Sequence, residues 1–147
     1  MTYVYLFNAA LLAACLYALW AGGAPERATA LVFIVAAALS YVVPYQRFHA
    51  VELPLLLVDI CALAALTAIA LIANRYWTLY VAAIQLLTVA IHAVKAYEPA
   101  LAFWMYNGVS SRLAYPLLIL LAVGVARHRE RLVRQGRDRA WSFSHRG

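Results

Sequence analysis

Residues 53–95 read LPLLLVDICALAALTAIALIANRYWTLYVAAIQLLTVAIHAVK, and this stretch decides the fold. It contains two long apolar runs, Leu53–Ala73 and Tyr76–Lys95, separated only by Asn74 and Arg75. A helix needs about 20 mostly apolar residues to cross the hydrocarbon core of a bilayer. Because lipid offers no hydrogen bonds to the backbone, such continuous runs must be helical. The two runs therefore predict a tight antiparallel pair of membrane-spanning helices.

The composition of the whole 147-residue chain excludes a water-soluble domain. Apolar residues make up 67% of the chain, charged residues make up 12%, and the mean hydropathy is +0.79. Soluble domains carry roughly 45–50% apolar and about 25% charged residues. A protein this small cannot hide so much apolar surface inside itself. We therefore expect an all-α fold, a polytopic membrane helical bundle.

Further spans flank the central pair. Two precede it, at Thr2–Ala21 and Ala28–Tyr45, and a fifth is expected at Gly108–Ala126. Residues 99–107 would form an interfacial half-helix or a bent continuation of that fifth helix. Pro116 lies inside it and lacks the N–H that a helix interior needs, which predicts a kink. If this last region does not span, the count falls from five helices to four.

Charge separates a transmembrane bundle, residues 1–126, from a basic tail, residues 127–147. The tail carries seven of the twelve Lys and Arg residues against Glu130 and Asp138, a net charge of +5. Positive residues stay on the cytoplasmic side of a membrane. The tail is therefore expected in the cytoplasm, below a bacterial-type inner membrane. Five spans would place the N-terminus outside, whereas four would place it inside.

The tail is expected to touch anionic lipid headgroups, because each Lys or Arg near such a surface contributes about 1 kcal/mol. The expected contacts are Arg127, Arg129, Arg131 and Arg134. No nucleic acid is expected as a partner, because charge alone is present without a recognition fold. Trp141 and Phe143 would enter the membrane interface or dock on a partner.

Three ionisable residues fall inside the expected spans, where such groups normally face protein or water. At about 1.5 Å of rise per residue, Asp59 lies about 9 Å deep, His92 about 4–5 Å and Arg112 about 6 Å. All three lie in the same half of the membrane. The fourth span carries a polar stripe at helical spacing, which comprises Thr78, Gln85, Thr88, His92 and Lys95.

Two interpretations of this polar cluster stay open. It forms either a pocket for protons, a quinone headgroup or a small polar ligand, or it holds the helices together by interhelical hydrogen bonds. The second is favoured, because no second acid or motif supports a pathway. The expected members are Asp59, His92, Arg112, Gln85, Thr88 and Glu52, which shares the face of Asp59.

No motif for catalysis, metal or cofactor binding is present, and none of these groups is expected. Haem is disfavoured because His92 is the one histidine inside a span. Small loops leave little room for chemistry, which argues against an enzyme. We expect an accessory or scaffold subunit that packs against itself or a larger membrane complex. The alternatives are a small transporter or channel protomer using the polar pocket, and a membrane subunit that holds quinone or haem.

Overall fold

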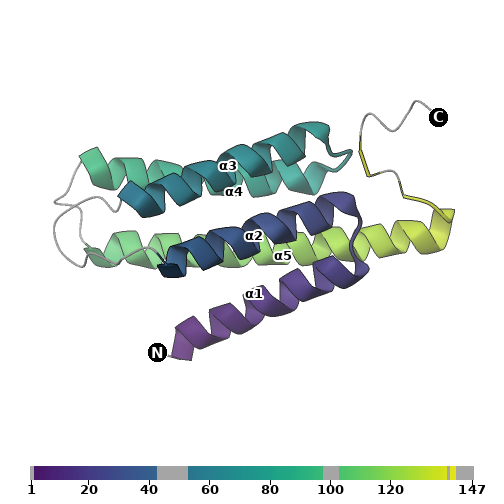
Figure 1. Cartoon of the computed structure of the whole chain (residues 1–147), viewed down its shortest axis with the longest axis horizontal. Coiled ribbons are helices and arrows are strands. Elements are labelled where there is room, and N and C mark those ends of the chain that lie inside the picture. The colour runs from purple at the N-terminus through teal and green to yellow at the C-terminus, as the bar shows by residue number, and fades with distance from the viewer. Residues whose placement is uncertain (1, 43–52, 98–102, 139, 142–147) are drawn as a thin grey trace.

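A computed structural model describes residues 2–42, 53–97, 103–138 and 140–141 of the chain. Its five helices are α1 (Thr2–Ala21), α2 (Ala24–Val42), α3 (Leu53–Ile72), α4 (Tyr76–Tyr97) and α5 (Phe103–Gln135). They lie side by side with their long axes roughly parallel (Figure 1). The predicted all-α helical bundle is confirmed.

Four of the helices, α1 to α4, are long and apolar enough to cross a membrane. The first predicted span coincides with α1, and the two runs that decide the fold form α3 and α4 with the predicted tight turn. Helix α2 begins at Ala24, four residues earlier than predicted. The reason is Pro25, whose fixed φ and missing N–H suit the first turn of a helix. Residues 43–45, the predicted end of this span, lie outside the described residues.

Helix α5 packs lengthwise against α1, α2 and α4. Residues 103–107 belong to it, so this part of the predicted half-helix continues the fifth helix. Pro116 lies inside α5 without ending it. The helix extends past the ends of the others (Figure 1) and carries the first part of the basic tail to Gln135. Gly136 then adopts φ +69° and donates its N–H to the Leu132 carbonyl, the left-handed cap that glycine favours.

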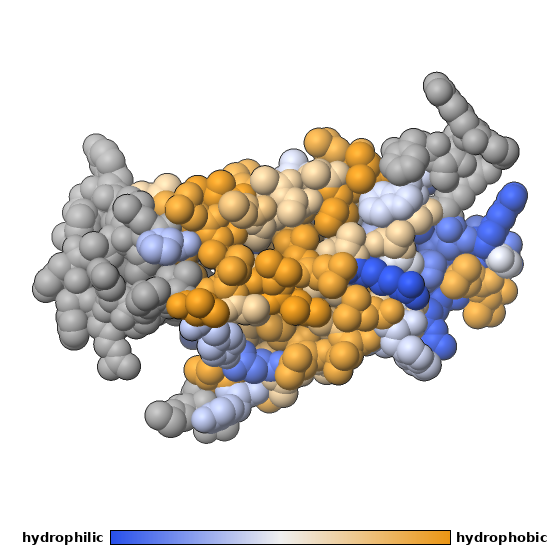
Figure 2. Space-filling model, viewed as in Figure 1, coloured by the Kyte–Doolittle hydropathy of each residue, from blue (hydrophilic) through white to orange (hydrophobic). Residues whose placement is uncertain are grey.

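The core runs along the bundle axis where α1, α2 and α5 meet the α3–α4 pair. Leu66, Val81 and Leu121 are among its fully buried members. At one end, the ring of Phe7 packs edge-on against Tyr115, which joins α1 to α5. Large apolar side chains also cover the outside, where Trp20 is 79% exposed. The apolar surface over the helices, and the charged end of α5, are visible in Figure 2. Lipid is the solvent that such a surface fits.

Beyond Gly136 the chain turns back toward the α3–α4 turn. Ala73 forms an isolated antiparallel bridge with Trp141. The N–H of Asn74 donates to the Ala140 carbonyl at 3.3 Å. Within the described residues, the tail thus docks on a turn of its own chain. This docking brings charged side chains of the tail, of α5 and of the α3–α4 turn together at one end of the bundle.

Candidate functional site

The first polar cluster lies between α3 and α4. Gln85 and His92 are seven residues apart on α4, so both face α3, and their side chains are 6% and 5% exposed. Nε2 of Gln85 donates to Oδ1 of Asp59 at 3.1 Å. Nε2 of His92 lies 3.0 Å from Oδ2 of the same carboxylate. Both oxygens of Asp59 therefore have a partner on the neighbouring helix, which is how a carboxylate is tolerated at membrane depth.

The two threonines of the predicted stripe donate hydrogen bonds to backbone carbonyls within α4 or directly before it. Thr88 donates to the carbonyl of Ile84 at 3.2 Å. Thr78, which is buried, donates to the carbonyl of Arg75 at 2.6 Å, at the start of the helix. The side chain of Lys95 lies outside the described residues, as does Glu52.

The sequence predicts Arg112 beside Asp59, and the structure does not bring it there. Its side chain is exposed and makes no ion pair with the described residues. The reason is the rotation of α5. Arg112 precedes the buried Leu117 by five residues, which at about 100° per residue puts the two about 140° apart. It instead shares a face with Ile119, which is 62% exposed.

A cleft of about 420 Å³ opens beside Asp59 and Gln85. Apolar residues such as Phe7, Phe33 and Leu118 make most of its wall. At its mouth, the side-chain amide of Asn8 hydrogen-bonds the hydroxyl of Tyr41 and so links α1 to α2. An apolar cleft with a few converging polar groups is the usual form of a small-molecule site. The cluster therefore has the shape for a ligand, although its polar atoms already bind each other.

The second polar cluster was missed by sequence reasoning. It lies at the opposite end of the bundle, where the carboxylate of Asp138 in the tail faces three basic side chains. Arg75 Nη2 and His128 Nδ1 are each 2.5 Å from Oδ2, and Arg131 Nε is 2.8 Å from Oδ1. Burial opposes the charge of Asp138, but hydrogen bonds from Arg131 and His128, with the positive charges of Arg75 and Arg131, lower its pKa below the ordinary value.

Glu26 extends this cluster inward. It is fully buried in the first turn of α2, and its Oε1 lies 3.8 Å from Nε of Arg75. A Cβ on Gly23 would lie 2.9 Å from Cε1 of His128 and 3.0 Å from Oε2 of Glu26. A side chain at position 23 would therefore have to displace the ends of the His128 and Glu26 side chains. Arg75 bridges two carboxylates from distant parts of the chain, Glu26 and Asp138.

The arginines expected at lipid headgroups divide into two groups. Arg127 and Arg129 are exposed. Arg131 is turned toward Asp138, and Arg134 pairs with Glu130 at 2.7 Å in an exposed i,i+4 pair. The signal that could have separated them is Gly136. A glycine after a helical run marks a helix end, and it reverses the chain so that Asp138 returns toward α5.

Both cysteines, Cys15 and Cys61, are free thiols. Within the described residues, no group of three or more His, Cys, Asp or Glu side chains is arranged to hold a metal ion. Comparison with known proteins found no matching family model, no matching curated protein and no matching solved structure. The function is therefore inferred from the two polar clusters and from the buried apolar layer of the core that lies between them.

Proposed function

We propose that this chain is a non-enzymatic accessory or scaffold subunit of a membrane assembly. The observation that supports this most is how its polar groups are used. Asp59, Gln85 and His92 tie α3 to α4, while Asp138 and Arg75 tie the tail to the α3–α4 turn. These contacts fix the relative positions of helices, which is what a scaffold requires, and interhelical hydrogen bonds of this kind contribute about 0.6–2 kcal/mol each.

The layer between the two clusters argues against a conduction path through one copy. Leu66 is seven residues from Asp59, Val81 is four from Gln85, and Leu121 is seven from His128. All three are fully buried. They form an apolar zone about 10 Å long, given the rise of a helix. An ion or proton crossing that zone would lose its hydrogen bonds, which is costly.

We further propose a five-span topology in a bacterial-type inner membrane, with the tail in the cytoplasm. Residues 113–126 of α5 are apolar, and the helix packs along three of the four apolar helices. Arg127 and Arg129 follow at the end that carries Arg27 and Arg75, so basic residues gather on one side of the bundle. That asymmetry supports the cytoplasmic assignment.

The scaffold proposal is tested by purifying the full chain from native membranes in a mild detergent. Cross-linking before extraction and mass spectrometry after it would identify what stays bound. We expect a stoichiometric membrane partner or a defined oligomer of this chain. A monomer that carries no partner, both before and after cross-linking, would contradict the proposal.

A second candidate is a small transporter or ligand-binding protomer, favoured by the 420 Å³ cleft next to Asp59. Its walls suit an amphiphile such as a quinone, with a polar headgroup near Gln85. The test is solute or proton flux in liposomes made with the purified chain. A pH-dependent flux that Asp59→Asn abolishes and Thr67→Val, at an exposed position of α3, leaves unchanged would favour this candidate over the scaffold.

A further inference from the structure

The second polar cluster borders a cavity of about 330 Å³ at the tail end of the bundle. It lies between the α3–α4 turn, the last turns of α5 and the start of the returning tail. The residues that line it are all polar or charged: Asn74, Arg75, Arg131, Gln135, Arg137 and Asp138. Because Asn74 and Arg75 connect two apolar helices, the cavity sits where a membrane surface would meet water.

The charges around the cavity do not balance. Three arginines line it against Asp138, and the buried Glu26 near Arg75 still leaves one positive charge in excess. Hydrogen bonding is also incomplete. Nη2 of Arg131 is buried and has no hydrogen-bond partner among the described residues. Nε of Arg75 also has none, but it lies 3.8 Å from Oε1 of Glu26, whose two oxygens are themselves buried without a hydrogen-bond partner. A buried guanidinium N–H without an acceptor is costly, so an acceptor from outside the chain would be stabilised here.

We propose that this cavity binds a phosphate group, with Arg131 as its principal ligand and Arg75 and Arg137 adding positive charge at the wall. Guanidinium groups donate parallel N–H bonds that match the oxygens of phosphate, and such charge-assisted bonds are among the stronger ones in proteins. The amides of Asn74 and Gln135 supply further donors at the wall. Two sources offer this group at a membrane surface: the headgroup of an anionic phospholipid and a free phosphate in solution.

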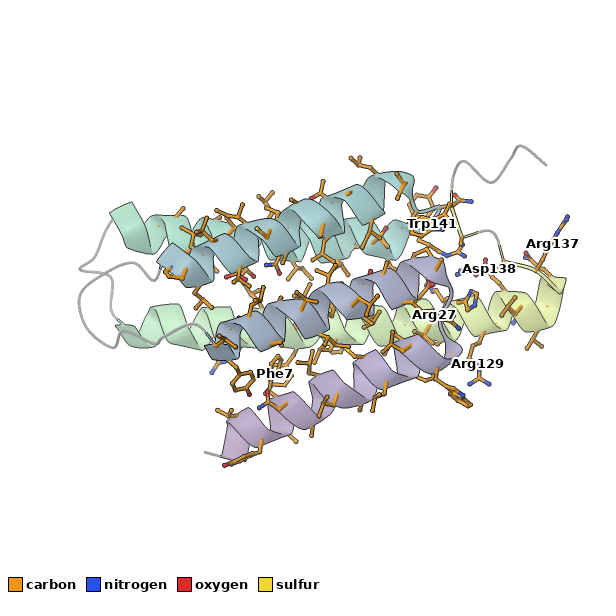
Figure 3. The ribbon with its side chains drawn as sticks, in the orientation of Figure 1. Phe7, Arg27, Arg129, Arg137, Asp138 and Trp141 are labelled. Atoms are coloured by element: carbon orange, nitrogen blue, oxygen red, sulfur yellow. The ribbon has the colours of Figure 1, made fainter. Side chains whose placement is uncertain are left out.

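This site differs from a general attraction between the basic tail and lipid. Arg129 is exposed and lies on the opposite side of α5 from Asp138 (Figure 3), so it would contribute to a general attraction without touching the cavity. Gln135 lines the cavity, whereas Val133, two residues earlier on α5, is 87% exposed and does not. These neighbours provide matched pairs of variants with equal changes of charge.

The test uses the full chain in detergent, with Gln135→Glu and its control Val133→Glu. Native mass spectrometry would measure binding of phosphatidylglycerol against phosphatidylcholine, and tryptophan fluorescence would follow a titration with inorganic phosphate. A negative charge in the cavity should weaken binding about fivefold or more, and the same charge at residue 133 should have a much smaller effect. Binding of phosphatidylglycerol alone identifies a lipid, whereas binding of inorganic phosphate identifies a soluble source.

Equal effects of the two glutamates would overturn the proposal, as would the absence of binding to both probes. A second pair, Arg131→Lys with Arg129→Lys as its control, keeps the net charge constant. Loss of binding in the first variant alone supports a site built from the guanidinium fork, because lysine is a point charge without it. Circular dichroism of each variant checks that the helices form. Partner purification uses the unaltered chain and reports no phosphate binding, so this proposal and the scaffold proposal fail separately.

Discussion

Nε2 of His92 lies 3.0 Å from Oδ2 of Asp59, and this contact joins α4 to α3 inside the apolar part of the bundle. Gln85 also donates to this carboxylate, so Asp59 has two partners on α4, Gln85 and His92. Removing the charge while keeping the shape should weaken this connection. Because the amide oxygen of an asparagine at this position would still accept from Gln85, we expect the loss to be moderate.

We therefore predict that Asp59→Asn lowers the free energy of unfolding by about 0.5–2 kcal/mol, the range for polar contacts between membrane helices. Unfolding in mixed micelles, followed by circular dichroism, measures it. Thr67→Val, an exposed position on the same helix, serves as the control and should change little. A stability of Asp59→Asn equal to that of the natural chain would show that the pair does not hold α3 to α4.

Asp138 should control whether the tail docks on the α3–α4 turn. Replacing it with Asn removes the charge that Arg75, Arg131 and His128 surround. We expect the segment after Gly136 to become several times more sensitive to protease, and the emission of Trp141 to shift to the red. Glu130→Gln removes an acid from an exposed pair and should leave both readouts unchanged. Identical digestion of Asp138→Asn and the natural chain would argue against the dock.

The same contact predicts a pH dependence. The pKa of Asp138 is lowered in the folded chain, so its contribution is fully present above the ordinary pKa of an aspartate. It is lost as pH falls through the lower, folded pKa. We expect protease sensitivity of the tail to stay constant near neutral pH and to rise only in strong acid. Release of the tail at mildly acidic pH would contradict this prediction.

Gly124 faces Trp77, and this approach leaves no room for a larger residue. A Cβ at position 124 would lie 2.7 Å from Cε2 of the indole, a rigid ring that must shift to admit it. We expect Gly124→Ala to cost about 1–3 kcal/mol of stability and to change the tryptophan emission. Val123→Ala alters the exposed neighbour and provides the control. An unchanged melting temperature in Gly124→Ala would contradict the packing of α4 against α5.

The proposed five-span topology can be tested with reporter fusions at each end of the chain. A fluorescent protein that folds only in the cytoplasm should be bright on the C-terminus and dark on the N-terminus. The reverse pattern is expected for alkaline phosphatase, which is active only outside the inner membrane. Cytoplasmic signals at both ends would mean four spans, with α5 lying elsewhere than across the bilayer.

The spans and the turn at Asn74 and Arg75 could be predicted from the sequence because hydropathy acts locally along a helix. The proximity of Asp59 to His92 also followed from their position in the same half of the membrane and from the helical spacing of the polar residues on α4. Arg112 shows the limit of depth as a guide. Depth depends only on distance from the helix end, whereas the direction of Arg112 around α5 depends on which face Leu117 and its neighbours bury. That direction could have been predicted from the spacing of Arg112, Ile119 and Val123, because residues seven and four apart share one face of a helix.

The cluster around Asp138 could not be predicted in the same way. It requires three parts of the chain to meet at α5: the first turn of α2 with Glu26, the α3–α4 turn with Arg75, and the tail with Asp138. No local pattern encodes that meeting, because the residues are separated by whole helices. The sole local sign was Gly136, whose left-handed backbone reverses the chain after Gln135.

The ion pair between Arg75 and Asp138 also has a consequence for biosynthesis. The ribosome makes Arg75 with the α3–α4 hairpin, whereas Asp138 emerges only after all five helices have been translated. During that interval the guanidinium has Glu26 as its one carboxylate neighbour from this cluster, and the turn stays open to whatever anion the nascent chain meets. Docking of the tail then closes it, so a chain truncated before Asp138 would keep this turn open.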